Sequence, residues 1–437
     1  MIKILKADEL NISRAAIQQQ ATSAEVTATV KAIIEDVIAR GDAAVREYTE
    51  KFDGCKLDTF EVAEAAIDTA VNEVCPEFIG VMKRAAKNIE DYHRHQIRED
   101  FRINLSVDET ENRPLSADHD IILGQRITPI ERVGIHIPGF TAALPSSLLM
   151  GCIPAKLAGV KEVIIITPPG KNGSVNPVIL AAARIAGADR VLSIAGAQAI
   201  AALAYGTESI PAVDKITGAG NAYVAEAKRQ VYGIVGIDMI AGPSDVLIIA
   251  DDTADEVLVA ADMLSQCEHG EESIAVLITD SMELANKVSA EIEIQLTKLP
   301  REEFARKSID NNGKIIIVET IDQAFDISNK LAPEHLEIFL PEPMKYLEKV
   351  KNAGSIFLGK NTPEALGDYY AGPNNTLPTL GTARFSSPLS VDDFTKKSSF
   401  TYYSEKALRS VADDVVKFAE MEGLRAHGLS VSKRVQT

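Results

Sequence analysis

Three of the seven histidines in this 437-residue chain stand in short segments beside other proton carriers or metal ligands. Imidazole is the usual proton carrier near neutral pH and the commonest metal ligand in proteins. The three segments are Gln266-Cys267-Glu268-His269-Gly270, Pro333-Glu334-His335-Leu336-Glu337 and Glu422-Gly423-Leu424-Arg425-Ala426-His427. A fourth segment, Gly367-Asp368-Tyr369-Tyr370-Ala371-Gly372-Pro373, places a carboxylate in a glycine-rich turn. These residue types indicate an enzyme with a metal site or an acid–base site.

Each of these segments also has an ordinary structural interpretation. Gln266 and His269 share one helix face, but a histidine before a glycine is also common at a helix C-terminus. Asp368 can form an Asx turn, and His427 near the chain end can be a solvated side chain. Cys267 is a candidate nucleophile, although a small buried helix residue is the commoner role of such a cysteine.

The adjacent pair Glu334 and His335 is a more specific signal, because it places an acid beside a base between a predicted helix and a predicted strand. The segment Gly218-Ala219-Gly220-Asn221 resembles the start of a dinucleotide-binding loop but lacks the third glycine, so it fails as a Rossmann fingerprint. Backbone amides at that turn can still bind a phosphate. The residues alone therefore predict a two-half α/β enzyme with a candidate metal site.

Composition is typical of a large soluble enzyme and excludes several other classes. The net charge of −18 and the pI near 4.9 argue against nucleic acid and anionic membranes, because their phosphates would be repelled. The four cysteines lack the CxxC spacing of a thiolate zinc site. The N-terminus has too short an apolar part for a signal peptide, and no apolar run is long enough to span a bilayer. We expect a cytoplasmic protein with no nucleic-acid or membrane partner.

Hydrophobic patterning predicts the elements that position these residues. Residues 24–41 and 61–94 carry apolar side chains at helical spacing. From residue 121 to residue 358, short β-branched runs alternate with helical stretches, which predicts parallel sheets covered on both faces. A final helix is expected over about residues 404–427. Because open α/β sheets bind ligands beyond the carboxyl ends of their strands, we expect the site there, in a cleft between two halves.

Six segments, taken together and in order, resemble those of the histidinol dehydrogenase family. They are Gly196–Glu208, Ala241–Ser244, Ser265–Gly270, Leu331–Glu337, Gly367–Gly372 and Gly381–Val391. Any one segment is weak evidence for the resemblance, but the ordered set of six is specific. The resemblance runs from about Val133 to His427, and the N-terminal helices match only in general character.

The resemblance implies a zinc-dependent and NAD-dependent enzyme. That family oxidises L-histidinol by four electrons through L-histidinaldehyde to L-histidine, the last step of histidine biosynthesis. The resemblance implies that Gln266, His269 and Asp368 bind one Zn2+ per subunit, joined by His427 from the partner subunit of a homodimer. Such a mixed nitrogen and oxygen donor set suits zinc or a similar divalent ion.

The resemblance also assigns the proton carriers and part of the substrate site. His335 would accept the alcohol proton and Glu334 would activate water for attack on the aldehyde. Ser244 and Glu422 match positions that contact substrate, and Glu422 would reach over from the other subunit. The four metal ligands and His335 complete the expected substrate site.

Gln198 and Asn221 match positions that hold NAD in the family, and His136 occupies a third such position. The chain departs from the family pattern here, since it reads His136-Ile137-Pro138-Gly139-Phe140 where Tyr-Val/Ile-Pro-Gly-Gly is usual. It also has Asn375 where a histidine is usual. These departures leave two alternatives open: a related zinc- and NAD-dependent dehydrogenase of another primary alcohol, and a non-catalytic metal-binding paralogue.

The expected fold class is α/β, with two similar Rossmann-like halves built on parallel or mixed sheets. We expect residues 1–25 to form an N-terminal helical segment. Residues 26–135 plus 244–385 would form a first, discontinuous α/β domain, and residues 136–243 would form the second. Residues 386–437 would be a small helical dimerisation extension that reaches the partner subunit.

Overall fold

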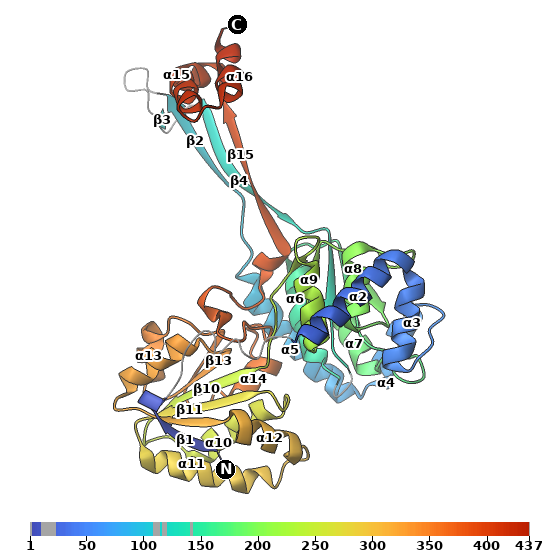
Figure 1. Cartoon of the computed structure of the whole chain (residues 1–437), viewed down its shortest axis with the longest axis vertical. Coiled ribbons are helices and arrows are strands. Elements are labelled where there is room, and N and C mark those ends of the chain that lie inside the picture. The colour runs from blue at the N-terminus through green and yellow to red at the C-terminus, as the bar shows by residue number, and fades with distance from the viewer. Residues whose placement is uncertain (1, 10–22, 108–113, 116–119, 140–142, 437) are drawn as a thin grey trace. The chain divides into compact units, whose positions relative to one another are not determined.

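The computed structural model describes residues 2–9, 23–107, 114–115, 120–139 and 143–436 of the chain. The chain forms two compact units, Met1–Gln96 with Ile130–Phe394 and Ile97–Pro129 with Thr395–Thr437. The first unit contains a five-stranded and a six-stranded sheet, both parallel (Figure 1). The second unit contains a four-stranded antiparallel sheet. The expected mixed α/β fold with parallel sheets is therefore confirmed.

The five-stranded sheet has the strand order β7-β6-β5-β8-β9. Its strands are β5 (Arg132–His136), β6 (Glu162–Ile166), β7 (Arg190–Leu192), β8 (Lys215–Thr217) and β9 (Gly236–Ile237). Residues 163–166 are a completely buried β-branched run, which is typical of a strand covered on both faces. One face is covered by α4 (Glu64–Glu73), α5 (Pro76–Arg94), α6 (Pro145–Leu157) and α7 (Pro177–Ala186). The other is covered by α2 (Ala24–Arg40), α3 (Asp42–Asp53), α8 (Gly196–Tyr205) and α9 (Ala222–Val231).

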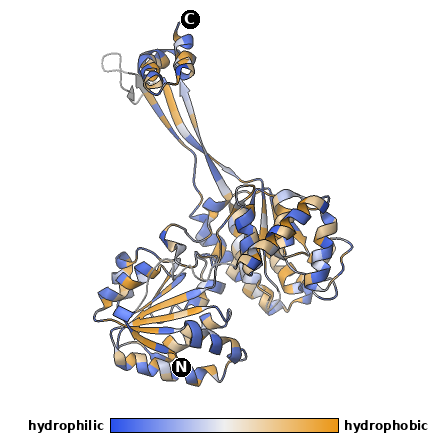
Figure 2. Ribbon diagram, viewed as in Figure 1, coloured by the Kyte–Doolittle hydropathy of each residue, from blue (hydrophilic) through white to orange (hydrophobic). Residues whose placement is uncertain are grey.

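The six-stranded sheet has the strand order β1-β12-β11-β10-β13-β14. Its strands are β1 (Lys3–Lys6), β10 (Asp245–Ala250), β11 (Ile274–Thr279), β12 (Lys314–Ile317), β13 (His335–Phe339) and β14 (Ser355–Leu358). On one face lie α10 (Glu256–Cys267), α11 (Met282–Leu296) and α12 (Glu302–Asn312). On the other lie α13 (Ile321–Leu331) and the 3-10 helix η2 (Pro343–Lys349). The central strands of this sheet are strongly apolar, as their colour in Figure 2 shows.

Short elements complete the first unit. They are η1 (Ala7–Glu9), α14 (Glu364–Tyr369), η3 (Thr382–Arg384) and η4 (Val391–Phe394). The helix α14 follows β14 and, as described below, brings two carboxylates to the start of β13.

The sheets divide the chain differently from the predicted domains. Residues 3–6 form the edge strand β1, parallel to β12, so the prediction of a helical segment over residues 1–25 is wrong for these residues. The helices α2 to α5 pack on the five-stranded sheet and contribute no residue to the cores on the six-stranded sheet. Strand β5 also belongs to that sheet, because it pairs with β6 and β8. The predicted boundary at residue 135 is therefore also wrong.

The second unit joins two separated stretches of the chain. Its strands are β2 (Phe101–Val107), β3 (Pro114–Leu115), β4 (Ile121–Pro129) and β15 (Thr395–Tyr403), in the order β15-β4-β2-β3. Residue 121 thus begins an antiparallel strand and not the first βαβ unit. The predicted final helix is two helices, α15 (Glu405–Met421) and α16 (Arg425–Val435), because Gly423 adopts a left-handed φ of 77° between them. Across the described residues, no helix has the length and apolarity needed to cross a membrane.

Candidate active site

The candidate catalytic residues of the first unit lie at the amino ends of strands in the six-stranded sheet. Ser244 directly precedes β10, and Glu334 directly precedes His335, the first residue of the neighbouring β13. These residues line a cavity of about 450 Å³. The expectation that they would lie beyond carboxyl ends is wrong for this sheet. It holds for the other sheet, because the carboxyl ends of β5 and β8 line the same cavity.

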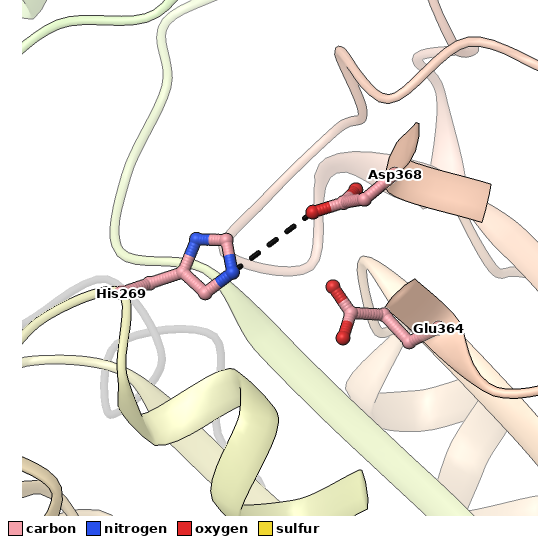
Figure 3. Close-up of side chains that lie close together, drawn as sticks. All are labelled: His269, Glu364 and Asp368. Atoms are coloured by element: carbon pink, nitrogen blue, oxygen red, sulfur yellow. Dashed lines mark ion pairs between the residues drawn. The ribbon is translucent and has the colours of Figure 1, made fainter. Parts of the chain in front are cut away.

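A cluster of one histidine and two carboxylates forms the candidate metal site. Ligand atoms of His269, Glu364 and Asp368 all lie within 4.8 Å of one another. Figure 3 shows the His269 ring facing both carboxylates. Its Nε2 lies 3.9 Å from Asp368 Oδ2. Burial and the neighbouring Glu364 raise the pKa of Asp368 to about 8. Carboxyl groups held this close together are stabilised as anions by a bound cation.

Gln266 supports the same interpretation. Its side chain is completely buried on the last turn of α10, one helical turn before His269. Neither its amide nitrogen nor its amide oxygen has a hydrogen-bond partner among the described residues. An unpaired buried amide lowers the stability of the fold. A metal ion bound to the Gln266 amide oxygen would supply the missing partner. The residues present therefore fit a divalent cation.

Sequence reasoning missed Glu364. Its Oε2 accepts a hydrogen bond from the Ser265 hydroxyl at 3.0 Å, and its backbone N–H donates to Glu337 Oε1 at 2.7 Å. These bonds fix the carboxylate beside the end of α10. The signal was present in the sequence, because Glu364 and Asp368 are four residues apart and share one face of α14.

Glu334 is held by a reciprocal pair of hydrogen bonds with Asp245. The backbone N–H of Asp245 donates to Glu334 Oε2, and the backbone N–H of Glu334 donates to Asp245 Oδ1, both at 3.0 Å. Burial, followed by the charge of Asp245, holds the pKa of Glu334 well above its usual value, and a hydrogen bond with Ser244 opposes that shift. Burial likewise raises the pKa of Asp245 to about 7. Asp245 is a second residue that sequence reasoning missed.

His335 is arranged as a neutral base. Its Nδ1–H donates to the Asp245 carbonyl oxygen at 2.9 Å, which leaves Nε2 as the unprotonated nitrogen. Within the described part of the chain Nε2 has no hydrogen-bond partner, and it lies 3.8 Å from Glu364 Oε1 and 4.0 Å from Asp368 Oδ1. Burial lowers the pKa of His335, so the ring stays neutral at physiological pH. A neutral imidazole with a free nitrogen can accept a proton from an alcohol.

Two of the predicted cofactor residues line a second cavity of about 360 Å³. Gln198 lies on the first turn of α8, and Asn221 caps α9 by accepting hydrogen bonds from the backbone N–H groups of Tyr223 and Val224. The same cavity is lined by Phe52 and Asp53, which end α3 and were not predicted from the sequence. In the described structure Gln198 Oε1 and Asp53 Oδ2 are buried without partners, and burial raises the pKa of Asp53 to about 6.

His136 does not line this cavity, although its side chain contacts Gly196, which does. The residue is 3% exposed, its Nδ1–H donates to the Ala219 carbonyl oxygen at 2.6 Å, and its Nε2 lies 3.5 Å from the Gly196 backbone N–H. Burial lowers its pKa to about 4. Phe140 lies outside the described residues. Asn375 lines the larger cavity, where its side-chain amide donates to the Asp368 carbonyl oxygen at 3.2 Å.

The remaining predicted residues have different surroundings. Glu422 and His427 belong to the second unit, where both are exposed at the junction of α15 and α16. Cys267 is buried, and burial raises its pKa to about 11, which does not fit a nucleophilic thiolate. His269, Asp368, Glu334, His335 and Ser244 are therefore gathered around one cavity by the first unit alone.

Comparisons with known proteins identify the family of this chain. The sequence model of the histidinol dehydrogenase family matches residues 16–435. The histidinol dehydrogenase of Clostridium acetobutylicum is 51% identical over 417 residues, covering 95% of this chain and 94% of that protein. One from Bacillus cereus is 53% identical over 411 residues, covering 94% and 93%. The crystal structure of histidinol dehydrogenase from Elizabethkingia anophelis is 36% identical, covers 100% of this chain and 98% of that one, and superposes with a TM-score of 0.88. The chain therefore belongs to the histidinol dehydrogenase family and is an oxidoreductase.

Proposed function

We propose that this enzyme oxidises L-histidinol through L-histidinaldehyde to L-histidine, using two NAD and one zinc ion per subunit. The observation that supports it best is the placement of His335. Its free Nε2 faces the carboxylates of the candidate metal cluster inside one cavity. A base and a cation site are thus adjacent, as the oxidation of an alcohol that also chelates a metal requires.

Gln266, His269 and Asp368 would hold the zinc, together with His427 from the partner subunit. Glu364 lies close enough to His269 and Asp368 to be a further oxygen donor. When bound, zinc would act as a Lewis acid that grips the imidazole and amine of the substrate and orients its alcohol carbon.

The protein groups would then move the protons. His335 accepts the alcohol proton at Nε2 while its Nδ1–H remains bonded to the Asp245 carbonyl, which fixes the ring orientation. Glu334 activates the water that attacks the aldehyde. Its raised pKa favours the protonated form, and a cation bound in the neighbouring metal site would lower that pKa by direct charge attraction.

NAD would bind in the cavity lined by Gln198 and Asn221, with Phe52, Asp53 and Tyr223 completing its walls. Asp53 Oδ2 and Gln198 Oε1 are both acceptors without partners in the described structure, so each can accept a hydrogen bond from a ribose hydroxyl or an amide. His136 remains a candidate cofactor residue. It would act indirectly, because its side chain connects the turn at Ala219 with the start of α8 at Gly196.

We further propose a homodimer whose second unit reaches the neighbouring active site. This unit exposes many large apolar side chains, with Phe418 at 73% and Met421 at 76% exposure immediately before Glu422. Such a surface is typical of an interface that a partner covers. Glu422 and His427 would then complete the substrate and metal sites of the other subunit. The absence of disulfides among the four cysteines fits the proposed cytoplasmic location.

The test is the appearance of NADH absorbance when the purified protein is mixed with L-histidinol and NAD. We expect two NADH per histidinol, abolished by a chelator and restored by zinc. NADH formation from other primary alcohols but not from histidinol would favour a related dehydrogenase. Zinc binding without NADH from any alcohol would favour a non-catalytic metal-binding paralogue.

A further inference from the structure

A completely buried ion pair lies at the catalytic cavity, which Asp238 lines, and has no part in the proposed chemistry. It joins Lys228, in α9, to Asp238, just after β9, and each side chain is only 1% exposed. Lysine is almost never fully buried unless it is paired, and removing its charge from water costs several kcal/mol. A stable fold does not require such a pair, because apolar residues of similar volume often serve as well.

The pair binds both backbone polar groups of one residue, Gly218. Lys228 Nζ donates to the Gly218 carbonyl oxygen at 2.9 Å, and the Gly218 N–H donates to Asp238 Oδ2 at 2.8 Å. Asp238 Oδ1 additionally accepts the backbone N–H of Met239 at 2.6 Å. The charged pair thus fixes the peptide groups on both sides of Gly218.

Gly218 begins a turn that cannot easily be held by other means. Its φ is +105°, and a Cβ atom at this position would lie 2.2 Å from the His136 carbonyl oxygen. The turn therefore lies directly against the end of β5, in a conformation that side chains disfavour. The His136 side chain holds the next residue by donating to the Ala219 carbonyl oxygen.

This turn borders both cavities. Gly218, Ala219 and Gly220 line the larger cavity with His335, and the next residue, Asn221, lines the cavity proposed for the cofactor. It lies at the carboxyl ends of β5 and β8, where the strand order reverses, which is the usual ligand position in such a sheet. A shift of the turn would therefore change the distance between the substrate in the larger cavity and the cofactor in the other.

We propose that Lys228 and Asp238 are positioning residues that hold the Gly218–Gly220 turn so that the reacting carbon of the substrate and the nicotinamide meet. This inference rests on the proposed function, since it presumes a hydride passing between the two cavities. A misplacement of about 1 Å can slow such a transfer about 10²-fold without weakening binding.

The test compares Lys228→Met and the double variant Lys228→Met/Asp238→Asn with a matched control. The double variant leaves no unpaired buried charge, and the asparagine oxygen still accepts the Gly218 N–H. The control is Lys215→Met, which breaks the ion pair with Asp393 at the opposite end of β8, away from both cavities. Folding is checked by circular dichroism and melting temperature, and zinc content by metal analysis.

The decisive readouts are kcat, the KM for histidinol and the kinetic isotope effect with histidinol deuterated at its alcohol carbon. We expect the double variant to lose about 10²-fold in kcat with a larger isotope effect, while zinc content and the histidinol KM stay within twofold. The Lys215→Met control should match the wild type in kcat and isotope effect, even where its melting temperature falls.

A folded double variant with kcat within threefold of the wild type would overturn the inference. So would a failure of both Lys228 variants to fold, since the pair would then serve stability. An equal loss of kcat in the control would overturn it too. Absence of NADH formation by the wild type is a different result, because it contradicts the proposed function before any variant is compared.

Discussion

Replacement of Gln266 by methionine should stabilise the zinc-free protein and should reduce the further stabilisation that zinc provides. Both amide atoms of Gln266 are buried and have no partner in the described structure. An unsatisfied buried polar atom costs about 1–3 kcal/mol, and methionine has a similar shape without that cost. We therefore expect Gln266→Met to raise the free energy of unfolding of the zinc-free protein by about 1–3 kcal/mol.

The stabilisation that zinc adds to the protein should decrease. A ligand present at 100 times its Kd stabilises the native state by about 2.7 kcal/mol. If loss of the amide oxygen weakens zinc about 10²-fold, the same zinc concentration then contributes only about 0.4 kcal/mol. The gain on adding zinc should therefore shrink by about 2 kcal/mol.

Urea unfolding with chelator and with a fixed excess of zinc measures both effects, and metal analysis after dialysis measures retention. Gln198→Met is the matched control, because Gln198 also has an unpaired buried amide oxygen but lines the other cavity. The control should leave zinc retention unchanged. A Gln266→Met protein that is less stable without metal, or that retains zinc like the wild type, would refute the assignment of this amide to the metal.

Three further predictions concern single residues. Burial lowers the pKa of His136 from 6.5 to about 4, so the unfolded chain gains this proton first as pH falls. His136 should therefore contribute a loss of about 3 kcal/mol of stability between pH 6.5 and 4. Comparing urea midpoints of the wild type and His136→Asn over this range isolates that loss from the opposite contributions of the buried carboxyl groups. Glu334→Gln should slow aldehyde oxidation about 10²–10⁴-fold in single-turnover measurements while alcohol oxidation changes little, and equal slowing of both steps would contradict the proposed roles. Mixing His427→Ala with His269→Ala subunits should restore one complete zinc site per hybrid dimer; verified hybrids that bind no zinc would argue against a shared site.

The parallel sheets could be predicted because their signal is local. Residues 163–166 and 246–250 are short apolar runs between helical stretches, and such runs are typical of strands covered on both faces. Strand β1 could not be predicted in the same way. It has four residues, and its partner β12 begins more than 300 positions later, at Lys314. No local pattern reports a pairing over that distance.

The candidate site shows the same limit. Sequence reasoning identified His269, Asp368 and His335 from scarce residue types in unusual settings, and the fold brings them to one cavity. It missed Asp245, whose role comes from its reciprocal hydrogen bonds with Glu334 across two neighbouring strands. It missed Asp53 because the end of α3 reaches the cavity proposed for the cofactor only through tertiary packing. Residues that act through partners distant in sequence carry no local signature.

The opposite orientation of the two sheets at the cavity fits the proposed binding of both a cation and a dinucleotide. The five-stranded sheet presents the carboxyl ends of its strands, so α8 and α9 begin there, and helix N-termini favour the phosphates of a cofactor. The six-stranded sheet presents its amino ends, so α10 ends there with Gln266 and His269 in and just after its last turn. The negative end of a helix dipole favours a cation, as do the adjacent carboxylates of Glu364 and Asp368. If both sheets had the same strand ends at the cavity, helix ends of the same polarity would lie on both sides of it. Those helix dipoles would favour ligands of one charge and disfavour either the cation or the phosphates.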